Sequence, residues 1–251
     1  MLRPLDWKRM IALALLLYLI SLIWNLPASF VWERVKDQLP AQVELHGLTG
    51  TIWSGRVNRI DVDGIDQGAL RWSWRPVGLL TAAIELDLGW TPRKGDVRAT
   101  LQVGTDTLTL ENVRGRLDAA AMASVNKAPF LLEGTWLLDV PVLELEDMEH
   151  VAQAEGRLVW EAAAGGLPTA LSLGDLVADL QENDGWLQFS LSDQGGPLGL
   201  QGDARWRPGQ AMELDTRLQA RATAEAGLAG GLALLGNPAA DGWISWRARL
   251  Q

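Results

Sequence analysis

The sequence predicts a mainly β protein, in which one N-terminal transmembrane helix precedes a curved, hairpin-rich antiparallel sheet with one or two short helices. Three observations lead to this fold class. An uncharged apolar run lies near the N-terminus, apolar and polar residues alternate along much of the chain after Pro40, and glycine-containing turn signals separate the alternating segments.

The apolar run extends from Ile11 to Leu26 and reads IALALLLYLISLIWNL. As a helix it would be about 24 Å long, and a helix continued to Trp32 would be about 33 Å long, which suits a hydrocarbon core of about 30 Å. Pro27 would bend such a helix without ending it. We therefore expect a transmembrane helix over residues 10–32, with membrane lipid as its partner. The side chains expected to anchor it are Ile11, Leu15, Leu19, Ile23 and Trp24.

Two other interpretations fit the run less well. A cleaved signal peptide would need a small-residue cleavage site, and Pro27-Ala28-Ser29 is a poor one. A buried core helix would show polar residues on one face, which this run lacks. A retained signal-anchor is therefore expected.

The charges that precede the run predict its orientation. Arg3, Lys8 and Arg9 lie before it, and the positive-inside rule places such residues in the cytoplasm. We expect a basic cytoplasmic tail over residues 1–9, a short linker helix over residues 33–40 and a translocated β domain over residues 41–251. In a bacterium this is a single-pass protein of the inner membrane with a periplasmic domain.

The expected domain is acidic. Residues 1–32 hold three basic side chains and one acidic side chain, so the rest of the chain carries 19 basic and 30 acidic side chains, a net charge of −11. A phosphate backbone would repel such a domain, the sequence shows no basic stripe, and nucleic acid is not an expected partner. The absence of cysteine excludes disulfides and thiolate metal sites, and it agrees with an oxidising compartment.

Alternation with a period of two predicts strands that have one apolar and one polar face, which is typical of an antiparallel sheet with one covered side. The alternating segments are residues 70–74, 84–88, 97–103, 108–110, 187–191, 198–206, 212–220 and 244–250. Turn signals lie at 63–64, 93–95, 104–106, 183–185, 195–197 and 208–209. Short helices are expected within 76–83, 118–124 and 222–235.

Tryptophan is unusually frequent, with 13 Trp against 3 Phe and 1 Tyr. A glycine precedes a tryptophan by a few residues at 50–53, 134–136, 156–160, 202–206 and 242–246. The irregular spacing excludes a solenoid of fixed period, whereas glycine bends followed by large rings suit a curved sheet. We expect the indoles on one face, either as an ordinary core or as the lining of a trough for an apolar ligand or for partner strands.

No constellation of residues indicates catalysis. His46 and His150 lie far apart in the sequence, and residues 61–66 resemble the start of a calcium loop but lack its later glutamate, so they are expected to form a strand-turn-strand unit. Residues 144–150 are an acidic run that suits a solvated edge or a docking patch, and residues 227–236 lack the Gly-Lys-Ser/Thr of a phosphate-binding loop. We expect no enzymatic activity, no cofactor and no metal.

Motifs at both ends of the chain resemble a known family. Residues 48–56 read LTGTIWSGR, residues 70–80 read LRWSWRPVGLL, and residues 234–238 read LLGNP. Together with the anchor, they are similar to the N component of bacterial type II secretion systems, whose early segment reads G-T-x-W-x-G. The middle of the chain matches only in its strand-like texture. The matching residues are Gly50, Thr51, Trp53, Gly55, Trp72, Trp74, Gly236, Asp241 and Gly242.

The resemblance implies a non-enzymatic inner-membrane accessory of the machine that exports folded proteins across the outer membrane. Its implied partners are other components of that machine, in the inner-membrane platform and the outer-membrane secretin. AsmA-like proteins, a family implicated in lipid handling, share the plan of an anchor followed by a curved sheet. The alternative function is therefore an AsmA-like periplasmic protein that holds lipid or another apolar ligand in a tryptophan-lined groove.

Overall fold

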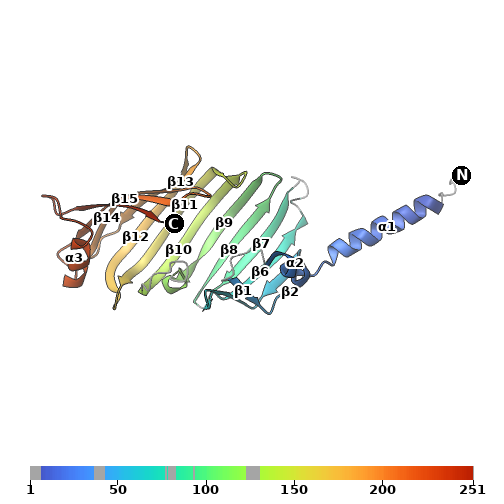
Figure 1. The fold of residues 1–251 in the computed structure, drawn as a ribbon, viewed down its shortest axis with the longest axis horizontal. Coiled ribbons are helices and arrows are strands. Elements are labelled where there is room, and N and C mark those ends of the chain that lie inside the picture. Colours follow the sequence, from blue (N-terminus) through green and yellow to red (C-terminus); the bar gives the residue numbers. More distant parts are fainter. Residues whose placement is uncertain are drawn as a thin grey trace.

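Sixteen β-strands and three α-helices make up the residues that the computed structural model describes, which are 7–36, 43–76, 78, 83–92, 94–122 and 131–250. Thirteen strands form one antiparallel sheet in the order β16-β15-β14-β13-β12-β11-β10-β9-β8-β7-β6-β3-β2. Three more strands form a small sheet in the order β1-β4-β5. The predicted mainly β fold is confirmed. Figure 1 shows one long, twisted sheet with α1 projecting from one end and α3 lying at the other.

The large sheet is a succession of hairpins, because almost every strand pairs with its neighbour in the sequence. Its first strands are β2 (Thr49–Gly50), β3 (Ser54–Val57), β6 (Ala69–Arg75), β7 (Ile84–Thr91), β8 (Gly95–Val103) and β9 (Thr107–Asp118). Its longest strands follow as β10 (Leu131–Glu146), β11 (His150–Gly166) and β12 (Leu171–Asn183). The last are β13 (Trp186–Asp193), β14 (Leu198–Trp206), β15 (Met212–Ala220) and β16 (Ile244–Leu250). All eight alternating segments of the sequence lie in these strands.

The small sheet contains β1 (Val43–His46), β4 (Arg59–Val62) and β5 (Ile65–Asp66). Asp63 and Gly64 join β4 to β5 with φ values of 51° and 76°. Two successive positive φ values are typical of a tight hairpin turn. The calcium-like run at 61–66 is therefore a strand-turn-strand unit, as expected.

The N-terminal helix is divided in two. The sequence predicted one helix over residues 10–32, whereas the structure has α1 (Trp7–Trp24) and α2 (Ala28–Val35). Pro27 lies between them with extended backbone (φ −65°, ψ 137°). A proline disfavours helical backbone in the residue before it, which explains why the helix ends here and does not only bend.

Other helical expectations are met in part. The segment at 222–235 contains α3 (Ala226–Ala233), and the segment at 118–124 contains the short 3₁₀ helix η3 (Ala119–Met122). The linker helix expected at 33–40 begins inside α2, but residues 37–40 lie outside the described residues. Most of the 76–83 segment lies outside them too.

None of the helices in the described part of the chain has both the length and the apolar character that crossing a membrane requires. Arg3, which was predicted to set the orientation, lies outside the described residues, as do the side chains of Lys8 and Arg9.

Matched irregularities keep the apolar side chains of the middle strands on one face. Val113 pairs with Val140 and Glu111 pairs with Val142, so Asn112 lies opposite Pro141 and the register between β9 and β10 is unbroken. Relative to their outer neighbours, β9 has one extra residue against β8 and β10 has one extra residue against β11. Asn112 has a φ of 52°, and proline lacks the N–H that a regular strand would donate. Because β9 and β10 carry their extra residues at the same level, the apolar side chains of both strands stay on the same face beyond it.

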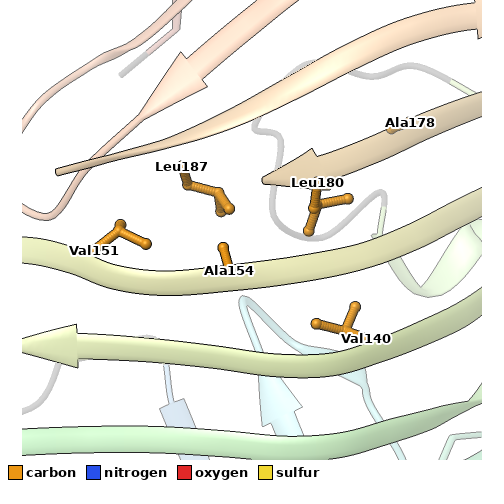
Figure 2. Close-up of a cluster of buried hydrophobic side chains, with 6 residues drawn as sticks. All are labelled: Val140, Val151, Ala154, Ala178, Leu180 and Leu187. Atoms are coloured by element: carbon orange, nitrogen blue, oxygen red, sulfur yellow. The ribbon is translucent and has the colours of Figure 1, made fainter. Parts of the chain in front are cut away.

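Two buried clusters lie on this apolar face. The first, drawn in Figure 2, is carried by neighbouring strands from β10 to β13 and contains Val140, Val151, Ala154, Ala178, Leu180 and Leu187. The second lies between α3 and the strands that it covers, and it contains Leu198, Leu218, Leu228, Leu232 and Ile244. In the C-terminal half of the sheet, the apolar face is therefore covered by the curl of the strands and by α3.

Candidate interaction surfaces

The end of α1 and the residues just after it are joined to the edge of the large sheet by hydrogen bonds to their backbone carbonyl oxygens. The indole Nε1 of Trp53 donates a hydrogen bond of 3.0 Å to the carbonyl oxygen of Ile23, and the backbone N–H of Ile52 donates one of 3.1 Å to the carbonyl oxygen of Leu26. Pro27 and Thr51 form an isolated antiparallel bridge. The α1–sheet junction, defined by these contacts, fixes the direction in which α1 leaves the sheet.

Three indoles fill the junction. The ring centroid of Trp24 lies 6.3 Å from that of Trp53 and 5.2 Å from that of Trp74, and the Trp53 and Trp74 centroids are 5.5 Å apart. Such offset and edge-to-face arrangements stabilise aromatic clusters beyond the area that they bury. The anchor residue Trp24 and two of the motif residues therefore meet in one cluster.

The G-T-x-W-x-G motif builds the hairpin that holds this cluster. Gly50 has a φ of 93°, which a residue with a side chain rarely adopts. The Thr51 hydroxyl accepts hydrogen bonds from the backbone N–H groups of Trp53 (3.3 Å) and Ser54 (3.2 Å). A Cβ atom at Gly55 would collide with the ring of Trp72. The glycines are therefore required by a tight turn and by a ring that lies against the backbone.

The remaining motif residues lie at the opposite end of the sheet. Asp241 pairs with Arg217 at 2.6 Å, and its carboxylate accepts a hydrogen bond of 3.2 Å from the backbone N–H of Trp243. That backbone hydrogen bond is the main reason why the pKa of Asp241 lies below its ordinary value. Gly242 has a φ of 82°, and Gly236 packs near Ile244. The two motifs therefore do not form one site.

Seven of the indoles lie on the apolar face of the large sheet, and Trp136 and Trp160 stack there with ring centroids 5.0 Å apart. The seven are Trp72, Trp74, Trp90, Trp136, Trp160, Trp206 and Trp246, whose strand partners continue the apolar rows. Most of the tryptophans in strands therefore lie on one face, as predicted.

Two tryptophans depart from that prediction. Trp186 alternates with Leu187, which belongs to the apolar core, so Trp186 lies on the polar face. The guanidinium groups of Arg205 and Arg207 cover its ring at 4.7 and 4.6 Å. Arg217 similarly covers Trp243 at 5.3 Å. The rings of Trp186 and Trp243 are therefore covered by cation–π contacts with arginine, whereas the other rings are covered by the apolar core.

One group of polar side chains was missed because its members lie on different strands. Glu44, His46 and Asp61 bring one potential metal-ligand atom each within 4.8 Å of the others. Asp61 also contacts the Nε of Arg59 at 3.2 Å, so a cation from the chain itself already neutralises it. The geometry therefore suits an ion-paired cluster at least as well as a metal centre.

A family model described as "Type II secretion system (T2SS), protein N" matches residues 41–247. The chain belongs to this family. The match spans the small sheet and nearly all of the large sheet, whereas α1 and α2 precede it.

Two curated relatives carry the same description, "Type II secretion system protein N". The protein from Vibrio cholerae serotype O1 is 29% identical over 166 residues, which are 63% of this chain and 64% of that protein. The protein from Aeromonas hydrophila is 37% identical over 84 residues, which are 34% of this chain and 33% of that protein. The matched segments thus span less than two thirds of either relative. No solved structure matches the chain.

Membership of the type II secretion system protein N family confirms the resemblance seen in the sequence. The prediction that the chain is not an enzyme agrees with this family, whose description names a component of secretion. The chain is therefore a type II secretion system protein N component.

Proposed function

We propose that this protein is anchored in the inner membrane, displays its sheets in the periplasm and supports the export of folded proteins across the outer membrane. The observation that carries the proposal is the family match over residues 41–247. The proposed partners are other type II secretion components, in the inner-membrane platform and the secretin.

The environment of α1 supports the proposed anchor. Its large apolar side chains are between 46% and 73% exposed, and such an exposed apolar surface needs lipid or a partner to cover it. By itself α1 lacks the length and apolar character of a crossing helix, so the proposed anchor relies on local thinning of the bilayer around its eighteen residues, which span about 27 Å. Trp7 and Trp24 lie at the two ends of α1, where aromatic belts at the membrane interfaces fall.

The proposal is tested in a deletion strain that carries tagged copies of the gene. The wild type and a Leu15→Ala/Leu19→Ala control should restore exoprotein export and recover other secretion components in a pull-down. A Leu15→Arg/Leu19→Arg variant should do neither, because each arginine at the helix centre costs about 2.5–3.5 kcal/mol of insertion free energy. Normal export by the deletion strain, together with a pull-down that recovers no secretion component, would refute the proposed function.

A second candidate function is favoured by the apolar face. Trp74, Leu86, Leu101, Leu110 and Leu143 are paired in that order across β6 to β10, and all are only half-buried. The row begins at the indole cluster of the α1–sheet junction, so it leads away from the proposed membrane surface. We infer that acyl chains of a lipid could lie along this row, as in the AsmA-like alternative.

Native mass spectrometry of the full chain, extracted in a neutral detergent, tests this second candidate. The wild type should retain lipid, and Leu101→Glu on the apolar face should lose it. Gln102→Glu, on the opposite face of the same strand, should retain it as the wild type does. A wild-type protein that carries no lipid would rule this function out.

A further inference from the structure

The polar face of the large sheet carries one continuous row of side chains, formed by one residue from each strand. From β8 to β12 the paired positions are Arg98, Arg114, Asp139, Arg157 and Asp179. Arg114 pairs with Asp139 at 3.1 Å, and Arg157 pairs with Asp179 at 2.6 Å. From Arg114 to Asp179, acidic and basic groups of the row therefore neutralise each other.

The row has a different character at its membrane-proximal end. There Arg56 on β3 lies directly opposite Arg71 on β6, and Arg71 lies opposite Gly89 on β7, which in turn lies opposite Arg98. Like charges in directly opposed positions destabilise a sheet. Three arginines therefore gather in a domain whose net charge is strongly negative, at a cost to the unliganded protein.

These arginines have few anionic partners within the described residues. Within the described residues the guanidinium group of neither Arg56 nor Arg71 makes an ion pair or a hydrogen bond, and that of Arg98 makes its one ion pair with the largely exposed Asp96, at 3.7 Å. Asp87, a carboxylate that lines the same hollow as these arginines, contacts Arg75 at 3.6 Å. Their positive charge is therefore available to a ligand.

The three arginines surround a hollow of about 700 Å³. Gly89 lies in its lining between Arg71 and Arg98, and a Cβ atom at that position would meet no other atom within 4 Å. The hollow is thus lined by three arginines, and Gly89 leaves space between two of them because it has no side chain. This cluster cannot be recognised in the sequence, because its members are 15 and 27 residues apart along the chain.

We propose that Arg56, Arg71 and Arg98 form a binding site for a phosphate group. Guanidinium groups donate paired hydrogen bonds that match phosphate oxygens, and several of them around one hollow favour a multiply charged or bidentate anion. The hollow is also lined by Gly50 and Ser54 of the hairpin that holds the end of α1. The phosphate of an anionic phospholipid headgroup is therefore the favoured source, and this choice of source rests on the proposed membrane anchor, whereas the site itself does not.

Isothermal titration calorimetry of the full chain in a neutral maltoside detergent tests the site at low ionic strength. The probes are short-chain phosphatidylglycerol, short-chain phosphatidylcholine and inorganic phosphate. Phosphatidylglycerol should bind at least about tenfold more tightly than phosphatidylcholine. Tighter binding of the anionic lipid than of inorganic phosphate supports the lipid source, and equal binding of the two supports a site for free phosphate.

Matched variants separate this site from general attraction to arginine. Arg56→Gln and Arg71→Gln should each weaken binding about tenfold, because each removes one charged hydrogen-bond donor. Arg157→Gln, in the same row but paired with Asp179, should bind as the wild type does. Gly89→Asp should abolish binding, because it places a carboxylate between two arginines.

The unfolding temperatures of Arg71→Gln and Gly89→Asp should equal or exceed that of the wild type, since both relieve repulsion between like charges. Binding of neither anion at millimolar concentration, or an equal loss in Arg157→Gln, would overturn the proposed site. Because the readout is binding by the purified protein, its failure would leave the export assay of the proposed function unaffected.

Discussion

At the scale of the residue, the G-T-x-W-x-G motif allows side chains and backbone to pack closely. Gly55 leaves room for the ring of Trp72, and the indole Nε1 of Trp72 donates to the backbone carbonyl oxygens of Thr51 (3.2 Å) and Ile52 (3.0 Å). The sequence identified the motif residues, but it could not show that Trp53 and Trp74 pack against Trp24, because that contact depends on the path of the chain through Pro27.

Replacement of Gly55 tests this packing. Gly55→Ala should lower the free energy of unfolding by about 1–3 kcal/mol, because the new methyl group overlaps the Trp72 ring. Chemical denaturation of the full chain in detergent measures the change. Gly230→Ala in α3 is the control; it meets no neighbour and should raise stability by up to about 1 kcal/mol. Equal stabilities of the Gly55 variant and the wild type would contradict the packing role.

Asp193 has a buried carboxylate whose charge is compensated on several sides. It accepts hydrogen bonds from Arg221 (2.6 Å) and from the backbone N–H groups of Gly195 and Leu200 (both 2.9 Å), and its side chain is 6% exposed. Burial alone would raise the pKa of Asp193, but these hydrogen bonds outweigh it and hold the pKa below its ordinary value.

The lowered pKa of Asp193 predicts a stability that depends on pH. A carboxyl group whose pKa is lower in the folded state stabilises the protein above its unfolded pKa of about 3.9, and this contribution is lost as the pH falls through the folded pKa. At pH 7, Asp193→Asn should therefore be less stable by roughly 1–3 kcal/mol. The difference from wild type should shrink below about pH 4, as denaturation curves measured at successive pH values would show. A difference that does not change with pH would argue against a charged, hydrogen-bonded Asp193.

At the scale of the element, strands of regular alternation were predicted and irregular strands were not. The segments 198–206, 212–220 and 244–250 coincide with β14, β15 and β16. The longest strands, β10, β11 and β12, gave no such pattern. Register shifts within the β10–β11 pair interrupt the period of two, and β11 is rich in alanine, glycine and glutamate, which are poor strand formers. Their strand structure comes from pairing with neighbours on both sides.

The helix α3 is held on the sheet by two leucines. Leu228 and Leu232 are 6% and 7% exposed and pack on the strands beneath, whereas Leu234, just after the helix, is 89% exposed. Leu228→Ala or Leu232→Ala should cost about 2–5 kcal/mol of unfolding free energy, while Leu234→Ala should change it by no more than about 0.5 kcal/mol. Thermal unfolding of the three variants compares them directly. Similar losses in all three would show that α3 does not cover the core.

At the scale of the whole molecule, the sequence predicted an apolar N-terminal segment and a one-sided sheet but not how they are joined. Trp53 and Ile52 donate hydrogen bonds to the carbonyl oxygens of Ile23 and Leu26, and these bonds attach the edge of the sheet to the end of α1. The apolar row and the arginine hollow both begin at this junction. If α1 lies in the bilayer, both surfaces begin at the membrane and extend into the periplasm.

Cysteine labelling tests whether a membrane-held α1 displays the sheets in the periplasm, because the chain has no cysteine of its own. One variant carries Leu2→Cys before α1, and the other carries Thr105→Cys in the exposed turn between β8 and β9. A membrane-impermeant maleimide added to spheroplasts should label Thr105→Cys at once and Leu2→Cys only after lysis, with both proteins in the membrane fraction. Protection of Thr105→Cys in intact spheroplasts, or recovery of the protein in the soluble fraction, would show that α1 does not hold the sheets in the periplasm.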